Sequence, residues 1–149
     1  MFLTVREEKG LCYTVQTATH DYSDTGVLST YAGVTIDKLP DAISAIREEY
    51  EKVAKDGLTG AEIQRAKDYL KGKITLRLED SQKYAHLLAE QHLLFSEQHT
   101  PEEIFAKIDA VTSEDIQKLA AELFQPAQFR LAVIGPYEAQ ERELSALLK

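Results

Sequence analysis

The first candidates for binding a zinc ion are the four histidines, His20, His86, His92 and His99. His86 and His92 lie closest in sequence, in a segment with helical periodicity, but six positions turn a helix by about 240° and point the two imidazoles apart. A helical zinc pair needs both rings on one face. Neither H-E-x-x-H nor its inversion H-x-x-E-H occurs in the chain. The sequence therefore predicts no metal site on this chain.

Nucleophiles and acid–base pairs give no stronger signal. The single cysteine, Cys12, has no neighbouring histidine, and the chain contains no G-x-S-x-G elbow and no glycine-rich phosphate-binding loop. Glu48-Glu49 and Glu102-Glu103 are adjacent on helical segments, where neighbouring side chains do not face each other. We interpret the carboxylates as solvated helix surface and Cys12 as a small buried residue. The motifs alone predict no catalytic residue on this chain.

Composition limits the class of protein. The chain has 149 residues, 44% of them hydrophobic, and a net charge of −8. A nucleic-acid or anionic-membrane surface needs clustered Lys and Arg, so we expect neither partner. No apolar run approaches the ~20 residues that span a bilayer. One cysteine excludes an internal disulfide. With no recognisable signal peptide, these features favour the cytoplasm.

The first regular structure expected is a β-hairpin. Residues 11–20 and 27–35 are rich in β-branched and aromatic residues. Residues 21–26 between them form a polar turn cluster. The period then changes, and an apolar stripe from Leu39 to Val53 predicts an amphipathic helix. Asp37 is a candidate cap, Pro40 fits the first turn, and Gly57 is suited to end the helix in a left-handed conformation.

Two later helix starts share one signature. Thr59 to Glu62 and Thr100 to Glu103 match the capping box, and residues 112–115 form a weaker variant with Asp in the last place. A long helix is expected after Thr59, although residues 74–78 also alternate like a strand. We favour the helix because the apolar stripe spans several turns. Residues 81–97 are expected to be helical for the same reason.

The chain ends with an expected strand and helix. Residues 129–136 have an apolar core between turn signals, which is typical of a strand buried on both faces, and residues 137–149 form a short amphipathic pattern. Two strands, five helices, one strand and one helix in this order predict an α+β fold in which an antiparallel sheet carries helices on one face. We expect one compact unit.

One stretch has a recognisable pattern. In residues 5–13 an Arg, Arg6, is followed after a charged stretch and a Gly by a Tyr, Tyr13. This resembles the C-terminal, non-zinc half of the insulinase, pitrilysin and mitochondrial processing peptidase family of inverzincin zinc metallopeptidases. Further segments agree in order with that family, namely residues 24–26, 31–33, 56–72, 108–112 and 131–136.

The resemblance implies a chemistry. Family members have two homologous halves that enclose a chamber. The N-terminal half carries zinc on H-x-x-E-H and a distant Glu, and the opposite half contributes an Arg and a Tyr that contact the peptide. Arg6 and Tyr13 would take these roles, because a guanidinium or a phenol hydroxyl stabilises the oxyanion of a tetrahedral intermediate. Zinc would be held by the N-terminal half, not by this chain.

The same resemblance implies that residues 1–149 are a partial C-terminal domain whose start is missing, inactive by itself. We expect it to bind a peptide substrate and the zinc-bearing half or a partner subunit, and to self-associate when isolated. Two alternatives stay open. The chain could belong to a catalytically inactive partner or scaffold subunit of the same fold, or it could be a stand-alone α+β binding module.

Overall fold

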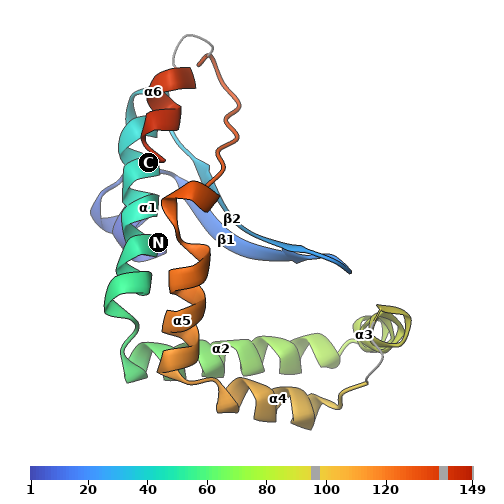
Figure 1. Ribbon diagram of the computed structural model, residues 1–149. Helices are drawn as coiled ribbons and strands as arrows, with labels where there is room; N and C mark the ends of the chain where they lie inside the picture. Colours follow the sequence, from blue (N-terminus) through green and yellow to red (C-terminus); the bar gives the residue numbers. More distant parts are fainter. Residues whose placement is uncertain (95–97, 138–140, 149) are drawn as a thin grey trace. The chain divides into compact units, whose positions relative to one another are not determined.

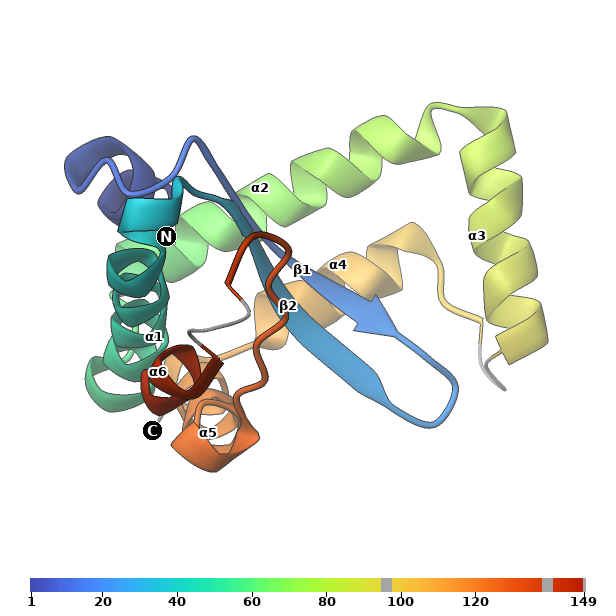
Figure 2. The same cartoon turned by 90° about the horizontal axis from the view of Figure 1, so that it is seen from above.

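The computed structural model describes residues 1–94, 98–137 and 141–148 (Figures 1 and 2). The chain forms two compact units where we expected one. The first unit contains Met1–Asp56 and Lys118–Lys149, and the second contains Gly57–Gln117. In chain order the elements are η1 (Phe2–Glu8), β1 (Thr14–Asp21), β2 (Gly26–Gly33), η2 (Ile36–Lys38), α1 (Leu39–Asp56), α2 (Gly60–Leu78), α3 (Ser81–Leu94), α4 (Pro101–Ala110), α5 (Ser113–Leu123), η3 (Pro126–Gln128) and α6 (Glu141–Ala146).

The expected β-hairpin is present in the first unit. β1 and β2 pair in antiparallel register from Thr14 opposite Gly33 to Asp21 opposite Gly26, and Figure 2 shows them as a twisted ribbon. β1 starts later than expected because the Leu11 amide donates its hydrogen bond backwards, to the Val5 carbonyl at 3.0 Å. Residues 11–13 therefore connect η1 to the hairpin instead of lengthening the strand.

Helix α1 packs against one face of this hairpin. The Tyr50 hydroxyl shares a hydrogen bond with Thr30 of β2, and Thr30 shares one of 2.7 Å with Thr17 of β1. Below them, Val15 of β1 and Ala45 of α1 belong to one buried cluster. The α+β fold class, with antiparallel strands covered on one face by helix, is confirmed.

The C-terminal residues of the first unit pack against α1. Leu39 and Ile43 of α1 form a second buried cluster with Tyr137 and Leu144, so α6 lies beside α1 (Figures 1 and 2). Gly57 has a φ of +71° and follows the last residue of α1, as expected of a helix stop. The expected cap Asp37 lies instead inside η2, a turn that precedes the helix.

The second unit is helical, and its predicted caps are confirmed. Thr59 and Glu62 form a capping box at the start of α2, and Thr100 and Glu103 form one at the start of α4. The weaker variant also closes, since the Thr112 amide donates to Asp115 at 2.9 Å and the Asp115 amide to the Thr112 hydroxyl at 3.1 Å. Local side-chain chemistry thus determined three helix starts.

Helices α2 and α4 are joined by lysine side chains. The Lys67 ammonium donates to the backbone carbonyls of Asp109 and Val111, at 2.8 and 2.7 Å. Lys71 forms an ion pair with the Asp109 carboxylate at 2.7 Å. Lys67 therefore satisfies carbonyls that the end of α4 leaves without a helical partner. Residues 74–78 are helical, so the helix was the right choice there.

Two expectations for the end of the chain need correction. The strand expected at residues 129–136 is not formed with any described part of the chain, and Ile134 is 103% exposed. A strand needs a neighbour to receive its ladder hydrogen bonds, and β1 and β2 pair only with each other in the described structure. The last helix, expected at residues 137–149, is shorter and spans Glu141–Ala146. Residues 138–140 and 149 of that prediction lie outside the described residues, and so do residues 95–97 of the helix expected at 81–97. None of the described helices is both long and apolar enough to cross a bilayer.

Candidate functional site

The segment that carries Arg6 and Tyr13 begins with a π-helical turn, which the sequence did not predict. η1 is followed by backbone hydrogen bonds from Lys9 to the Thr4 carbonyl at 3.0 Å and from Gly10 to the Arg6 carbonyl at 3.1 Å. Gly10 has a φ of +58°, a left-handed conformation that glycine adopts without strain. π-helical turns are rare and occur frequently at functional sites.

Two buried residues anchor this segment. Val5 is 0% exposed and Cys12 is 8% exposed, and both pack with Val15 of β1 and Ala45 of α1. Each anchor immediately precedes one candidate residue: Val5 precedes Arg6, and Cys12 precedes Tyr13. One small apolar cluster therefore fixes the backbone at both candidate positions. No periodic apolar pattern marks Val5 in the sequence, which is why we did not identify it as an anchor.

Within the described part of the chain, the Arg6 side chain has only weak local partners. Its guanidinium lies 4.7 Å from the centre of the Phe2 ring, and its Nη1 lies 3.4 Å from an oxygen of Glu7. The Arg6 and Glu7 side chains are 40% and 52% exposed. Exposed ion pairs contribute little to stability. The guanidinium is thus free to exchange Glu7 for a stronger acceptor.

Tyr13 lies at the start of the hairpin with its ring at the surface. Its side chain is 69% exposed, and its amide donates to the Gly33 carbonyl at 3.0 Å. The ring crosses the backbone of Gly33 on the neighbouring strand. Among the described residues, its hydroxyl has no hydrogen-bond partner. Sequence reasoning found Tyr13 but did not connect it to Gly33, because cross-strand neighbours are known only once the register is.

Cys12 behaves as expected of a buried thiol. Burial raises its pKa, and the positive charge of Arg6 offsets part of this shift. A raised thiol pKa leaves little thiolate near neutral pH, and the thiolate is the nucleophile. Cys12 therefore serves the core.

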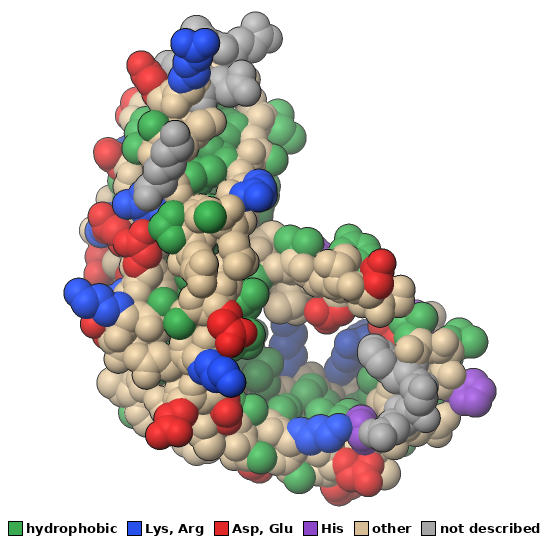
Figure 3. Space-filling model, viewed as in Figure 1, with side chains coloured by type: hydrophobic (Ala, Val, Ile, Leu, Met, Phe, Trp, Pro, Cys, Tyr) green, Lys and Arg blue, Asp and Glu red, His purple; other side chains and the backbone are tan. Residues whose placement is uncertain are grey.

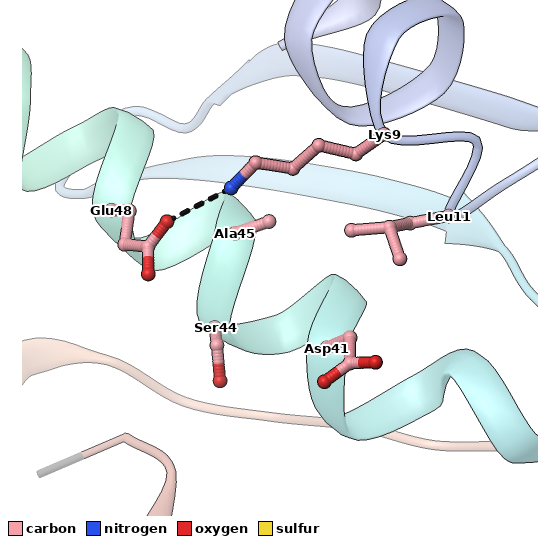
Figure 4. A pocket seen from close by; sticks show the side chains of 6 residues that line it. All are labelled: Lys9, Leu11, Asp41, Ser44, Ala45 and Glu48. Carbon is pink, nitrogen blue, oxygen red and sulfur yellow. Dashed lines mark hydrogen bonds and ion pairs between the residues drawn. The ribbon is translucent and has the colours of Figure 1, made fainter.

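A surface depression lies beside this segment but does not include the two candidates. It has a volume of 410 Å³ and is lined by Lys9, Leu11, Asp41, Ser44, Ala45 and Glu48 (Figure 4). Lys9 and Glu48 form an ion pair of 3.0 Å across it. This ion pair neutralises two of the three charged side chains that line the depression.

The carboxylate pairs do not form an acid–base site. Glu48 binds Lys9, and Glu49 accepts a hydrogen bond of 2.9 Å from the amino group of Met1. Glu49 is partly buried, which corrects our expectation of a solvated side chain. Burial alone would raise its pKa, but the hydrogen bond and charge of the amino group outweigh it and lower the pKa. Glu103 is engaged in the α4 capping box.

Three of the four histidines have partners other than a metal. His20 shares a hydrogen bond of 3.1 Å with Ser29, and His92 shares one of 3.1 Å with Gln98. Lys107 donates to His99 at 2.6 Å. Within residues 1–94, 98–137 and 141–148, no three His, Cys, Asp or Glu side chains gather as metal ligands would. The described residues therefore do not fit a zinc ion.

Comparison with known proteins gives consistent matches. Residues 1–70 match the peptidase M16 inactive domain. An uncharacterized zinc protease of Mycobacterium leprae is 36% identical over 141 residues, which cover 95% of this chain and 32% of that protein. The beta subunit of the mouse mitochondrial-processing peptidase is 27% identical over 128 residues, covering 86% of this chain and 26% of its own.

Structural comparison agrees on the fold. A chain in a structure of complex III2 from Candida albicans superposes with a TM-score of 0.72 at 23% identity, covering 80% of this chain and 28% of that one. This chain spans about a third of the length of the curated relatives it matches. The family model, the relatives named as zinc proteases and the fold all agree with the family resemblance of the sequence. Residues 1–70 of this chain match the inactive domain of the peptidase M16 family, and 95% of the chain is similar to a protein named as a zinc protease.

Proposed function

We propose that this chain is part of the C-terminal, non-zinc half of a zinc metallopeptidase, in which Arg6 and Tyr13 contact the peptide at the scissile bond. The observation that carries the proposal is the shared anchoring of two exposed polar side chains. Arg6 and Tyr13 each follow a residue of one buried cluster, within the part of the chain that matches the family model. A rigid backbone under exposed donors is what substrate positioning requires.

The chemistry suits peptide hydrolysis. Attack on a peptide carbonyl gives a tetrahedral species whose oxygen carries negative charge, and preorganised donors stabilise that charge. The Arg6 guanidinium is always charged and offers several N–H donors. The Tyr13 phenol offers one O–H donor. Zinc would be supplied by the other half of the intact protein, since the described residues of this chain do not fit it.

Exposed apolar surface supports a partner for each unit. In the first unit Tyr22 is 65% exposed and Ile134 103%; in the second, Leu76 is 68% exposed and Leu93 78%. Hydrophobic side chains are visible on the surface in Figure 3. In the intact protein the zinc-bearing half or a partner subunit would cover such surface. Isolated, the chain should self-associate, and light scattering at micromolar concentration should detect a dimer or larger species; a monomer would contradict this expectation.

A second candidate is a catalytically inactive partner subunit. One observation favours it: a relative that covers 86% of this chain is named as a subunit of a processing peptidase. An intact protein with H-x-x-E-H in its other half would favour the peptidase, and its absence would favour the partner subunit. The free thiol Cys12 is consistent with a cytoplasmic location for either.

The proposal is tested by Arg6→Ala and Tyr13→Phe in the intact protein. Loss of one oxyanion donor costs roughly 10²–10³ in rate, so kcat/KM should fall by that order for either change. Tyr13→Phe removes only the hydroxyl. Tyr31→Phe, at a tyrosine with almost the same exposure, is the matched control and should leave kcat/KM unchanged.

Zinc content and melting temperature should stay constant in all three variants. If Arg6→Ala and Tyr13→Phe both cleave peptides within about twofold of the unmodified protein, the assignment is wrong. If activity falls only together with melting temperature, the two residues serve the core and not the reaction.

A further inference from the structure

Gly33 occupies a position where the backbone itself does not require glycine. It ends β2 in regular antiparallel register, opposite Thr14. Its φ is not positive, in contrast to Gly10 at +58° and Gly57 at +71°. Any residue could adopt the Gly33 backbone conformation, so the reason for a glycine there must lie in its surroundings.

Those surroundings are the ring of Tyr13. A Cβ added to Gly33 would lie 2.6 Å from Cε2, 2.7 Å from Cζ and 2.9 Å from the hydroxyl oxygen of Tyr13. All three distances are shorter than real Cβ contacts. Gly60 and Gly72 have nothing within 4 Å of the same position. The Tyr13 ring therefore lies directly on the Gly33 backbone, with its hydroxyl end over the glycine.

This contact holds a ring that has little else to hold it. Tyr13 is 69% exposed, yet Gly33 beneath it is buried. The Tyr13 amide is tied to the Gly33 carbonyl at 3.0 Å, so backbone and ring of Tyr13 are placed by the same residue. An aromatic ring that covers a glycine on the adjacent strand loses rotamer freedom and shields the strand backbone.

We propose that Gly33 is a positioning residue: it provides the flat surface that sets the orientation of the Tyr13 hydroxyl, and any larger side chain there would displace it. The functional part of this inference rests on the proposed role of Tyr13; the packing part does not. A displacement of about 1 Å in a positioning group can cost about 100-fold in rate.

The test is a double-mutant cycle in the intact protein, with kcat/KM and zinc content measured for Gly33→Ala, Tyr13→Ala and the double variant. Gly33→Ala alone should lower kcat/KM by about 10- to 100-fold, with zinc content unchanged. In the Tyr13→Ala background the same change should alter kcat/KM by less than about twofold, because no ring is left to displace. Tyr31→Ala is the control background, because Tyr31 lies on β2 with Gly33 and is almost as exposed as Tyr13. In this background Gly33→Ala should keep its full effect.

A spectroscopic readout on the present chain separates the two parts. The ring current of Tyr13 should shift the Gly33 Hα resonances upfield, and Tyr13→Ala should abolish that shift while Tyr31→Ala leaves it. Unshifted Gly33 resonances, or an equal loss of activity from Gly33→Ala in the presence and absence of Tyr13, would overturn the inference. If the shift is present but Tyr13→Phe has full activity, the packing stands and the proposed role of Tyr13 fails. If Tyr13→Phe is impaired and Gly33→Ala is not, the positioning role fails alone.

Discussion

Val5→Ala should destabilise the chain and loosen the segment that carries Arg6. Val5 is the one side chain of its size that is completely buried among the described residues, in a cluster with Cys12, Val15 and Ala45. The substitution removes two methyl groups, each contributing about 0.8 kcal/mol on burial. A cavity term adds to this loss where the site cannot collapse. The expected destabilisation is therefore about 2–3 kcal/mol.

Urea unfolding measures this loss. With a slope of about 2 kcal/mol per molar urea, the midpoint should fall by about 1 M or slightly more. Leu3→Ala is the matched control on the same π-helical turn, because Leu3 is 65% exposed and its truncation should cost less than about 0.5 kcal/mol. In native buffer, the Cys12 thiol should also react faster in Val5→Ala than in the unmodified chain. Equal midpoints for the two variants would refute the view that Val5 anchors this segment.

Two further changes test the local chemistry. Thr59→Ala removes the capping box of α2 and should lower the free energy of unfolding by about 1 kcal/mol, measured by thermal unfolding. The control is Thr75→Ala, which removes a mid-helix hydroxyl that donates to the Lys71 carbonyl and should lower it much less. Equal effects of the two variants would contradict the stabilising role of the cap. Folding raises the pKa of Cys12, so the folded state retains the thiol proton longer and stability should fall as pH rises above the pKa of the unfolded thiol. Cys12→Ala should remove this loss of stability at alkaline pH. If the stability of the variant depends on pH in the same way as that of the unmodified chain, another group causes the loss.

Local signals were sufficient for much of the fold. A capping box satisfies backbone donors within four residues, so Thr59 and Thr100 mark helix starts whatever surrounds them. The hairpin was predictable because strand composition and a polar turn lie within one short stretch. The left-handed stop at Gly57 likewise depends on its own φ of +71°. In each case the energy that decides the conformation comes from neighbours in sequence.

The sequence also identified Arg6 and Tyr13 as candidates, through a pattern of residue types shared with a family. It could not say what holds them in place. Val5 is tied to Ala45 of α1, forty residues away in the chain, and a burial of that kind leaves no mark on the local pattern.

Only the tertiary structure decided the features that depend on a partner far away in the sequence. Residues 129–136 have the composition of a buried strand, but composition cannot supply the neighbouring backbone, and in the described structure they pair with no other strand. Glu49 looked like a solvated carboxylate until the fold placed its side chain in a partly buried position. Gly33 looked like the end of a strand until the hairpin register brought Tyr13 across it. The local sequence determines which backbone conformations have low free energy. Contacts between residues far apart in the chain determine which side chains are buried, ion-paired or held in place.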